Sequence, residues 1–215
     1  MKISKAISFP LVAAMVFAGV SASGSTARAQ NNNSGSSSPL ALRPRGSATS
    51  GTAKFLKEAA RHNDMEVALA EMGARKAQNQ KLKQYCQQLQ HEQQAINSEL
   101  RPIAREHGLS LDQSLTPVDQ TQLNRLEKET GATFDRRLAS YLLADQNRNI
   151  STLKKASYET AANDAKEYAK QTLPKIQQEL RRTADLAGQV GVSQATISSM
   201  TQKQPEAVGG AEEIR

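Results

Sequence analysis

The sequence predicts an all-α protein, an antiparallel bundle of four long helices with one additional short helix. Residues 51–190 are rich in Ala, Leu, Gln, Glu, Lys and Arg, the residues that favour helices, and they contain few glycines or prolines. This segment has the usual length of one domain. Residues that start and stop helices divide it into five pieces. We therefore expect one helical domain.

The first two helices are bounded by capping residues. We expect the first helix over residues 52–77, with Ser50 or Thr52 as its N-cap, because a hydroxyl accepts a hydrogen bond from a free amide of the first turn. Asn79 is the expected N-cap of the second helix, which ends before Gly108. Glycine is typical of the position that follows a helix.

Three further helices follow, over residues 117–130, 132–161 and 163–190. Thr116 followed by Pro117 is typical of an N-cap and the first helical residue, and this helix is short. Gly131 separates it from the fourth helix. Asn163 or Asp164 begins the last one.

The first 29 residues are typical of a secretory signal peptide. Two lysines precede the apolar run AISFPLVAAMVFAGV, and Ala27-Arg28-Ala29 fits a cleavage site that would leave Gln30 at the N-terminus. An uncleaved N-terminal anchor is the alternative. We expect an exported protein of the periplasm or cell envelope, with no transmembrane span in the mature chain.

The segments that flank the helical domain differ from it in composition. Residues 30–50 are rich in Asn, Ser, Gly and Pro, and we expect a disordered leader. Residues 191–215 are expected to form a flexible C-terminal tail.

Charge and cysteine content exclude several classes of protein. The formal net charge is +7, and it falls to +4 once the expected signal peptide with its three basic residues is removed. No basic patch is interleaved with aromatic residues, so we expect no nucleic-acid binding. Cys86 is the single cysteine, so no intramolecular disulfide can form, and we expect it in the core.

Each long helix places a polar side chain on its apolar, inward face. With an advance of about 100° per residue, Glu66 lies at the centre of this face in the first helix, and His62 lies one turn earlier. Gln93, Gln146 and Glu179 hold the equivalent places in the other three long helices. A buried, unpaired polar group costs about 1–3 kcal/mol, so these side chains must meet one another, a water molecule or a metal.

Two explanations remain open for these residues. In one, Glu66, Glu179 and His62 hold a divalent metal such as iron, manganese or zinc between the helices, as bundle cores often do. In the other, Gln93 and Gln146 donate hydrogen bonds to the two carboxyl groups in a polar core layer. Glutamine is a poor ligand for transition metals, and the sequence holds no Glu-x-x-His pair. We predict no other cofactor.

Four stretches resemble an exported bacterial family known as domain of unknown function 4142. They are EVALAEMGARKAQNQKLKQYC, INSEL, GATFDRRLASYLLADQ and AKQTLPKIQQEL. The resemblance implies a bundle of the ferritin-like type in the periplasm or outer membrane, without a known activity. It also implies that histidines commonly occupy the places of Gln93, Gln146 and Glu179, whereas Glu66 matches the family.

The sequence favours a non-enzymatic role. It contains no Gly-x-Ser-x-Gly motif and no phosphate-binding glycine loop. We expect an envelope protein with a binding, structural or stress-protective role, and the alternative is the metal-binding protein described above. A third hypothesis is self-association or docking of a protein partner through an exposed face of the second helix. That face comprises Gln84, Gln87, Gln88, His91 and Gln94.

Overall fold

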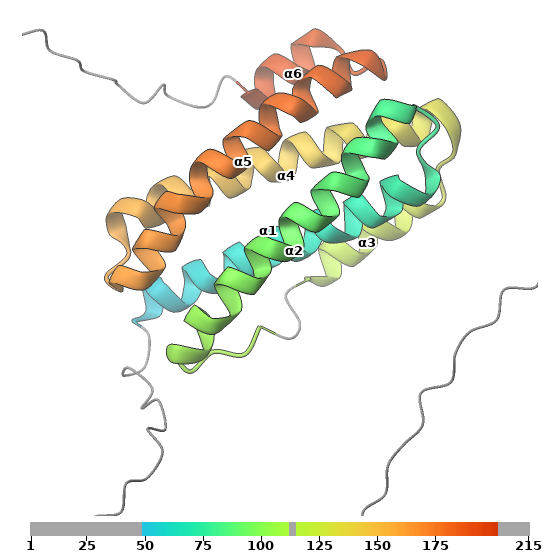
Figure 1. Cartoon of the computed structure of the whole chain (residues 1–215). Coiled ribbons are helices and arrows are strands. Elements are labelled where there is room, and N and C mark those ends of the chain that lie inside the picture. The colour runs from blue at the N-terminus through green and yellow to red at the C-terminus, as the bar shows by residue number, and fades with distance from the viewer. Residues whose placement is uncertain (1–48, 112–114, 202–215) are drawn as a thin grey trace, which may run out of the picture. The chain divides into compact units, whose positions relative to one another are not determined.

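The structure, a computed structural model, describes residues 49–111 and 115–201. Within these residues it is all-α, with six helices and no strand (Figure 1). The helices are α1 (Ser50–Lys76), α2 (Gln80–Glu106), α3 (Pro117–Glu127), α4 (Gly131–Glu159), α5 (Asn163–Gln189) and α6 (Gln194–Thr201). The predicted signal peptide and most of the predicted leader lie outside the described residues.

The four long helices pack around a shared core in the order α1, α2, α5, α4. Hydrogen-bonded pairs show that neighbours run antiparallel, because the residue number rises on one helix as it falls on the next. These pairs are Asn63–Asn97 and Glu71–Gln90 between α1 and α2, and Tyr85–Thr183 and Glu99–Lys175 between α2 and α5. Helix α4 runs antiparallel to α1, because Gln146 pairs with Glu66 and Asp135 pairs with Gln78. Helices α2 and α4 therefore run in the same direction, and the segment that contains α3 connects the end of α2 to the start of α4 (Figure 1).

The helix starts follow from local hydrogen bonds. The prediction that Asn79 caps α2 is confirmed, because its side chain accepts a hydrogen bond from the Leu82 amide at 3.0 Å. The predicted N-cap of α1 is wrong, since Thr49 takes this role and accepts from the Thr52 amide at 3.3 Å. Ser50 is already helical, and the extended backbone of Thr49 is what turns its hydroxyl toward the first turn.

Two further boundaries were predicted correctly. Thr116 caps α3 in a reciprocal arrangement with Asp119, and Pro117 occupies the first helical position. Gly108 follows α2 with a φ of 71°, a backbone conformation that favours glycine.

Helix α6 differs from expectation. The sequence assigns residues 191–215 to a flexible tail, but residues Gln194–Thr201 form a second short helix that packs on α4 and α5. Residues 202–215 of the predicted tail lie outside the described residues. Ile197 is its buried residue, and Ser193 accepts a hydrogen bond from the Thr196 amide at 3.2 Å. One buried apolar residue makes no recognisable periodic stripe, so the pattern could not reveal this helix.

The core consists of two apolar clusters. On α1, the first cluster ends at Ala60 and the second begins at Met65. On α2 the order is reversed, so the second cluster ends at Leu89 and the first begins at Ile96. Of the polar side chains that the sequence places on the inward faces, His62 and Gln93 lie in these two intervals.

The contact between α1, α2 and α4 is close at Gly73. A Cβ atom at this position would lie 2.3 Å from the Cys86 sulfur and 2.7 Å from a methyl carbon of Leu138. Cys86 is buried, as the sequence predicted. The absence of a side chain at Gly73 therefore allows these helices to approach one another.

We expect Gly73→Ala to lower the free energy of unfolding by about 1–3 kcal/mol, because the added methyl group would overfill the core. Urea denaturation followed by circular dichroism measures this change. Gly51→Ala is the matched control, since its added Cβ would have no neighbour within 4 Å. Equal stability of the two variants would contradict the close approach at Gly73.

Candidate functional site

The most distinctive feature of the core is a polar layer that draws one residue from each long helix. It comprises Glu66 of α1, Gln93 of α2, Gln146 of α4 and Glu179 of α5, each at most 2% exposed. The Gln93 side-chain amide donates to Glu66 at 3.1 Å and to Glu179 at 2.8 Å. Gln146 donates to the same oxygen of Glu66 at 3.3 Å. Hydrogen bonds through Glu66 and Gln93 thus connect all four helices.

Tyr85 extends the polar layer along α2 and α5. Its hydroxyl lies 2.8 Å from the Thr183 hydroxyl and 3.3 Å from the backbone carbonyl of Glu179. Gln146 also donates to this hydroxyl, at 3.4 Å. Tyr85 and Thr183 were not among the predicted residues, because a hydroxyl at the edge of an apolar stripe does not stand out from the apolar residues around it.

Burial and mutual repulsion favour the protonated forms of both carboxyl groups in the polar layer. Desolvation is the largest cause that raises the pKa of Glu66 well above its ordinary value, and the nearby Glu179 and Asp145 add to it. Desolvation, followed by the charge of Glu92, raises the pKa of Glu179 to about 8, although Arg182 opposes this. At neutral pH the polar layer therefore retains protons that exposed carboxyl groups would have released.

Three buried oxygens of the polar layer have no hydrogen-bond partner. They are one carboxyl oxygen of Glu66 (Oε1) and the amide oxygens of Gln93 and Gln146. A proton on Glu66 converts one of these acceptors into a donor, which is a second reason to place a proton there. An oxygen that stays unpaired could still accept a bond from water or bind a cation.

His62 lies apart from this hydrogen-bonded set. Its Nδ1 lies 3.0 Å from a carboxyl oxygen of Asp145, whose other oxygen accepts from Arg148 at 3.1 Å. Arg61 approaches the ring nitrogens at 3.1–3.2 Å and also donates to Asp119 at the start of α3. Because arginine can only donate, the bonds are satisfied when Nδ1–H donates to Asp145 and Nε2 accepts from Arg61.

The three residues of the predicted metal site do not belong to one hydrogen-bonded set in the structure. Glu66 and Glu179 share the donor Gln93, whereas both ring nitrogens of His62 face other partners. Among the described residues, no group of three or more His, Cys, Asp or Glu side chains is placed to hold a metal ion. Asp145 was not among the predicted residues. It is separated from His62 by 83 positions, and a pattern within one helix cannot reveal such a pair.

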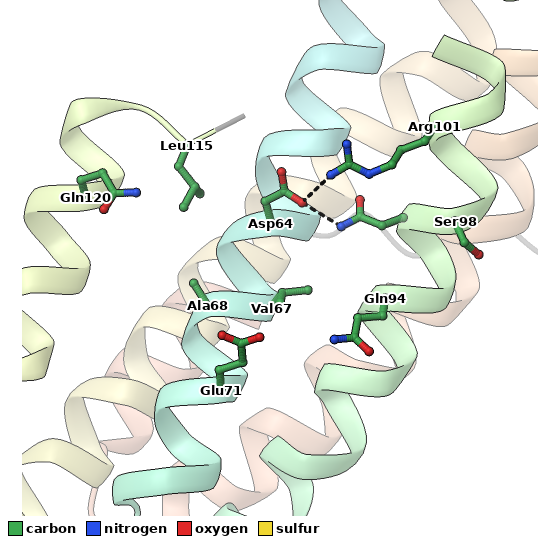
Figure 2. A pocket seen from close by; sticks show the side chains of 10 residues that line it. Asp64, Val67, Ala68, Glu71, Gln94, Ser98, Arg101, Leu115 and Gln120 are labelled. Atoms are coloured by element: carbon green, nitrogen blue, oxygen red, sulfur yellow. Dashed lines mark hydrogen bonds and ion pairs between the residues drawn. The ribbon is translucent and has the colours of Figure 1, made fainter. Parts of the chain in front are cut away.

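A groove on the surface adds a second candidate site. It lies between α1, α2 and the start of α3 and has a volume of about 720 Å³ (Figure 2). Val67, Ala68 and Leu115 provide its apolar part. Asp64 and Glu71 contribute carboxylates.

The Asp64 carboxylate in the groove accepts hydrogen bonds on one of its two oxygens. Asn97 donates to Asp64 at 2.8 Å and Arg101 donates at 3.5 Å, and both bonds fall on the same oxygen, Oδ1 (Figure 2). Glu71 is exposed and accepts from Gln90 at 3.3 Å. Since the groove carries two acidic residues and one basic residue, its charge is opposite to that of the whole chain.

The exposed face of α2 is as expected. All of its side chains face solvent: Gln84, Gln87, Gln88, His91 and Gln94.

No described helix has the length and apolar character needed to cross a membrane.

These features define an all-α protein in which four long antiparallel helices enclose a hydrogen-bonded polar layer. Residues 37–186 match the family described as "Domain of unknown function (DUF4142)", and the chain belongs to this family. The resemblance noted in the sequence is confirmed. This description assigns no activity to the chain.

A solved structure is similar to the bundle. It is described as "Crystal structure of DUF305 fragment from Deinococcus radiodurans", and it matches with a TM-score of 0.55 and 14% sequence identity. The match covers 66% of this chain and 99% of that chain. At this identity the likeness shows the fold alone. No curated protein matches the sequence.

The raised pKa values predict a pH-dependent stability. A carboxyl group with an ordinary pKa of 4.5 in the unfolded chain and about 8 in the folded protein binds its proton more tightly when folded. The free energy of unfolding should therefore fall as the pH rises from about 5 to 8, by at most about 1.4 kcal/mol per pH unit for each carboxyl group.

Glu179→Gln should reduce this fall, because glutamine imitates the protonated carboxyl group at every pH. Urea denaturation at pH 5, 6, 7 and 8 measures the effect. Glu58→Gln, which removes an exposed carboxylate that pairs with Lys54, is the control. If Glu179→Gln keeps the wild-type slope, the titrating group lies elsewhere.

Proposed function

We propose that the protein is an exported helical bundle of the cell envelope that acts through binding or in a structural or stress-protective role, and not through catalysis. The observation that carries this proposal is that the buried polar residues form hydrogen bonds with one another across the helices. Glu66 and Glu179 accept hydrogen bonds from Gln93, and His62 is paired with Asp145. Side chains committed to holding helices together are unsuited to bind and transform a substrate.

We also propose that the bundle is of the ferritin-like type. The support is its connectivity, because bundles of this type contain one long crossover connection. Here the chain between α2 and α4 spans residues 107–130 and includes α3, whereas α1–α2 and α4–α5 are joined by three residues each.

Export is supported by the N-terminal sequence alone. Two lysines, an apolar run and Ala27-Arg28-Ala29 occur in the order that a signal peptidase requires. We expect the protein recovered from a periplasmic or envelope fraction to begin at Gln30.

Mass spectrometry of the intact protein tests this expectation. Ala27→Leu/Ala29→Leu is the control variant and should retain the N-terminal segment, since the cleavage site needs small residues at these two positions. A wild-type protein that stays in the cytoplasm with its first 29 residues attached would contradict the proposal.

A divalent metal in the polar layer is the second candidate function. Its specific support is the set of three buried oxygens without partners, on Glu66, Gln93 and Gln146. Glu66 and Glu179 fit a metal, because carboxylate oxygens are good ligands. His62 does not fit without rearrangement, because Arg61 occupies its Nε2. A bound metal would act as a Lewis acid or redox centre, and the role of Gln93 would be to orient both carboxylates.

Metal content of the purified protein decides between the two candidates. We expect less than one tenth of an equivalent of iron, manganese or zinc after incubation with each ion and removal of the free ion. Near-stoichiometric metal that is lost in Glu66→Gln and retained in Glu58→Gln would establish the second candidate instead. Binding should then strengthen between pH 6 and 9, because the metal must displace protons from carboxyl groups of raised pKa.

A further inference from the structure

We propose that the surface groove between α1, α2 and α3 is a peptide-binding site, and that it is occupied by residues 39–46 of the same chain, PLALRPRG. The helical part of the chain begins at Ser50. The family match nevertheless begins at residue 37, so residues 39–46 lie within the matched region.

The segment and the groove are complementary in chemistry. The groove offers an apolar surface from Val67, Ala68 and Leu115, flanked by the carboxylates of Asp64 and Glu71. The segment offers two leucines and two arginines in alternation with small residues and prolines. Because the hydrogen bonds from Asn97 and Arg101 both fall on Oδ1 of Asp64, its second oxygen is open to an arginine of the segment.

The length of the chain fits the distance to be covered. Asp64 lies 14 residues after Ser50, about 21 Å along the axis of α1. Six extended residues, from Thr49 back to Arg43, span about 20 Å. The side chain of Arg43 would therefore reach the level of Asp64, and the residues from Leu40 to Leu42 would lie over Val67 and Ala68.

Proline content favours the extended form that this arrangement needs. Pro44 disfavours helical geometry at Arg43, and Pro39 does the same at the preceding serine. An extended segment held by such residues loses less conformational entropy on docking than a glycine-rich one.

A second groove competes for the segment but fits it less well. It lies between α1 and α4, nearer to the start of α1, and has a volume of about 390 Å³. Its charged residues balance, because Lys54 pairs with Glu58 and Lys155 pairs with Glu159. It therefore offers no net attraction to the two arginines.

Disulfide trapping in the full chain tests the proposal. One variant combines Ala41→Cys with Gln94→Cys, which lies in the proposed groove. The matched control combines Ala41→Cys with Ser151→Cys, an exposed position in the competing groove. Cys86 is buried and does not compete for the new thiol. Adding Arg43→Glu to each pair tests whether the positive charge at position 43 directs the segment to the acidic groove.

We expect the Gln94→Cys pair to oxidise at least about fivefold faster than the control pair, and Arg43→Glu to remove most of this advantage. Position 151 is closer to the start of α1, so an undirected leader would favour the control. Equal rates, a faster control pair, or a rate unaffected by Arg43→Glu would overturn the proposal. Because both pairs contain the same leader cysteine, a general loss of folding would lower both rates together.

Discussion

The structure depends on one constraint, the burial of a polar side chain from each of four helices at the same level of the core. An amide or carboxyl group that loses water without gaining a partner costs about 1–3 kcal/mol. Gln93 meets this cost for three helices at once, because its amide reaches both Glu66 and Glu179. Sliding any of these helices by one turn would move its polar group about 5 Å into apolar surroundings. The polar layer therefore fixes the register of the bundle.

This constraint has an electrostatic consequence. The donors that reach the oxygens of the two carboxyl groups belong to neutral amides, and amides cannot compensate two negative charges within a buried site. Keeping these carboxyl groups protonated costs less free energy than burying their charges. The raised pKa values of Glu66 and Glu179 follow from this difference. The buried pair of His62 and Asp145 differs, because the flanking Arg61 and Arg148 supply positive charge beside the carboxyl group.

Periodicity within single helices was sufficient to predict the four residues of the polar layer. Glu66, Gln93, Gln146 and Glu179 are all buried, because an advance of 100° per residue describes a straight helix well. Pairing between helices could not be predicted in the same way. His62 was assigned to a metal set with Glu66 because the two lie one turn apart, yet its ring turns toward Asp145 on α4. Only the packing of α1 against α4 determines that choice.

The polar layer comes nearest to solvent at the seam between α2 and α5. A pocket of about 250 Å³ opens there, and Glu179 forms part of its wall. Arg182 covers this point, since its guanidinium binds Glu92 at 3.1 Å and lies 5.7 Å from the centre of the Tyr85 ring. The same two residues act in opposite directions on the pKa of Glu179, with Glu92 raising it and Arg182 lowering it. The surface ion pair and the buried carboxyl groups thus behave as one electrostatic unit, in which a change at the surface alters how tightly the core holds its proton.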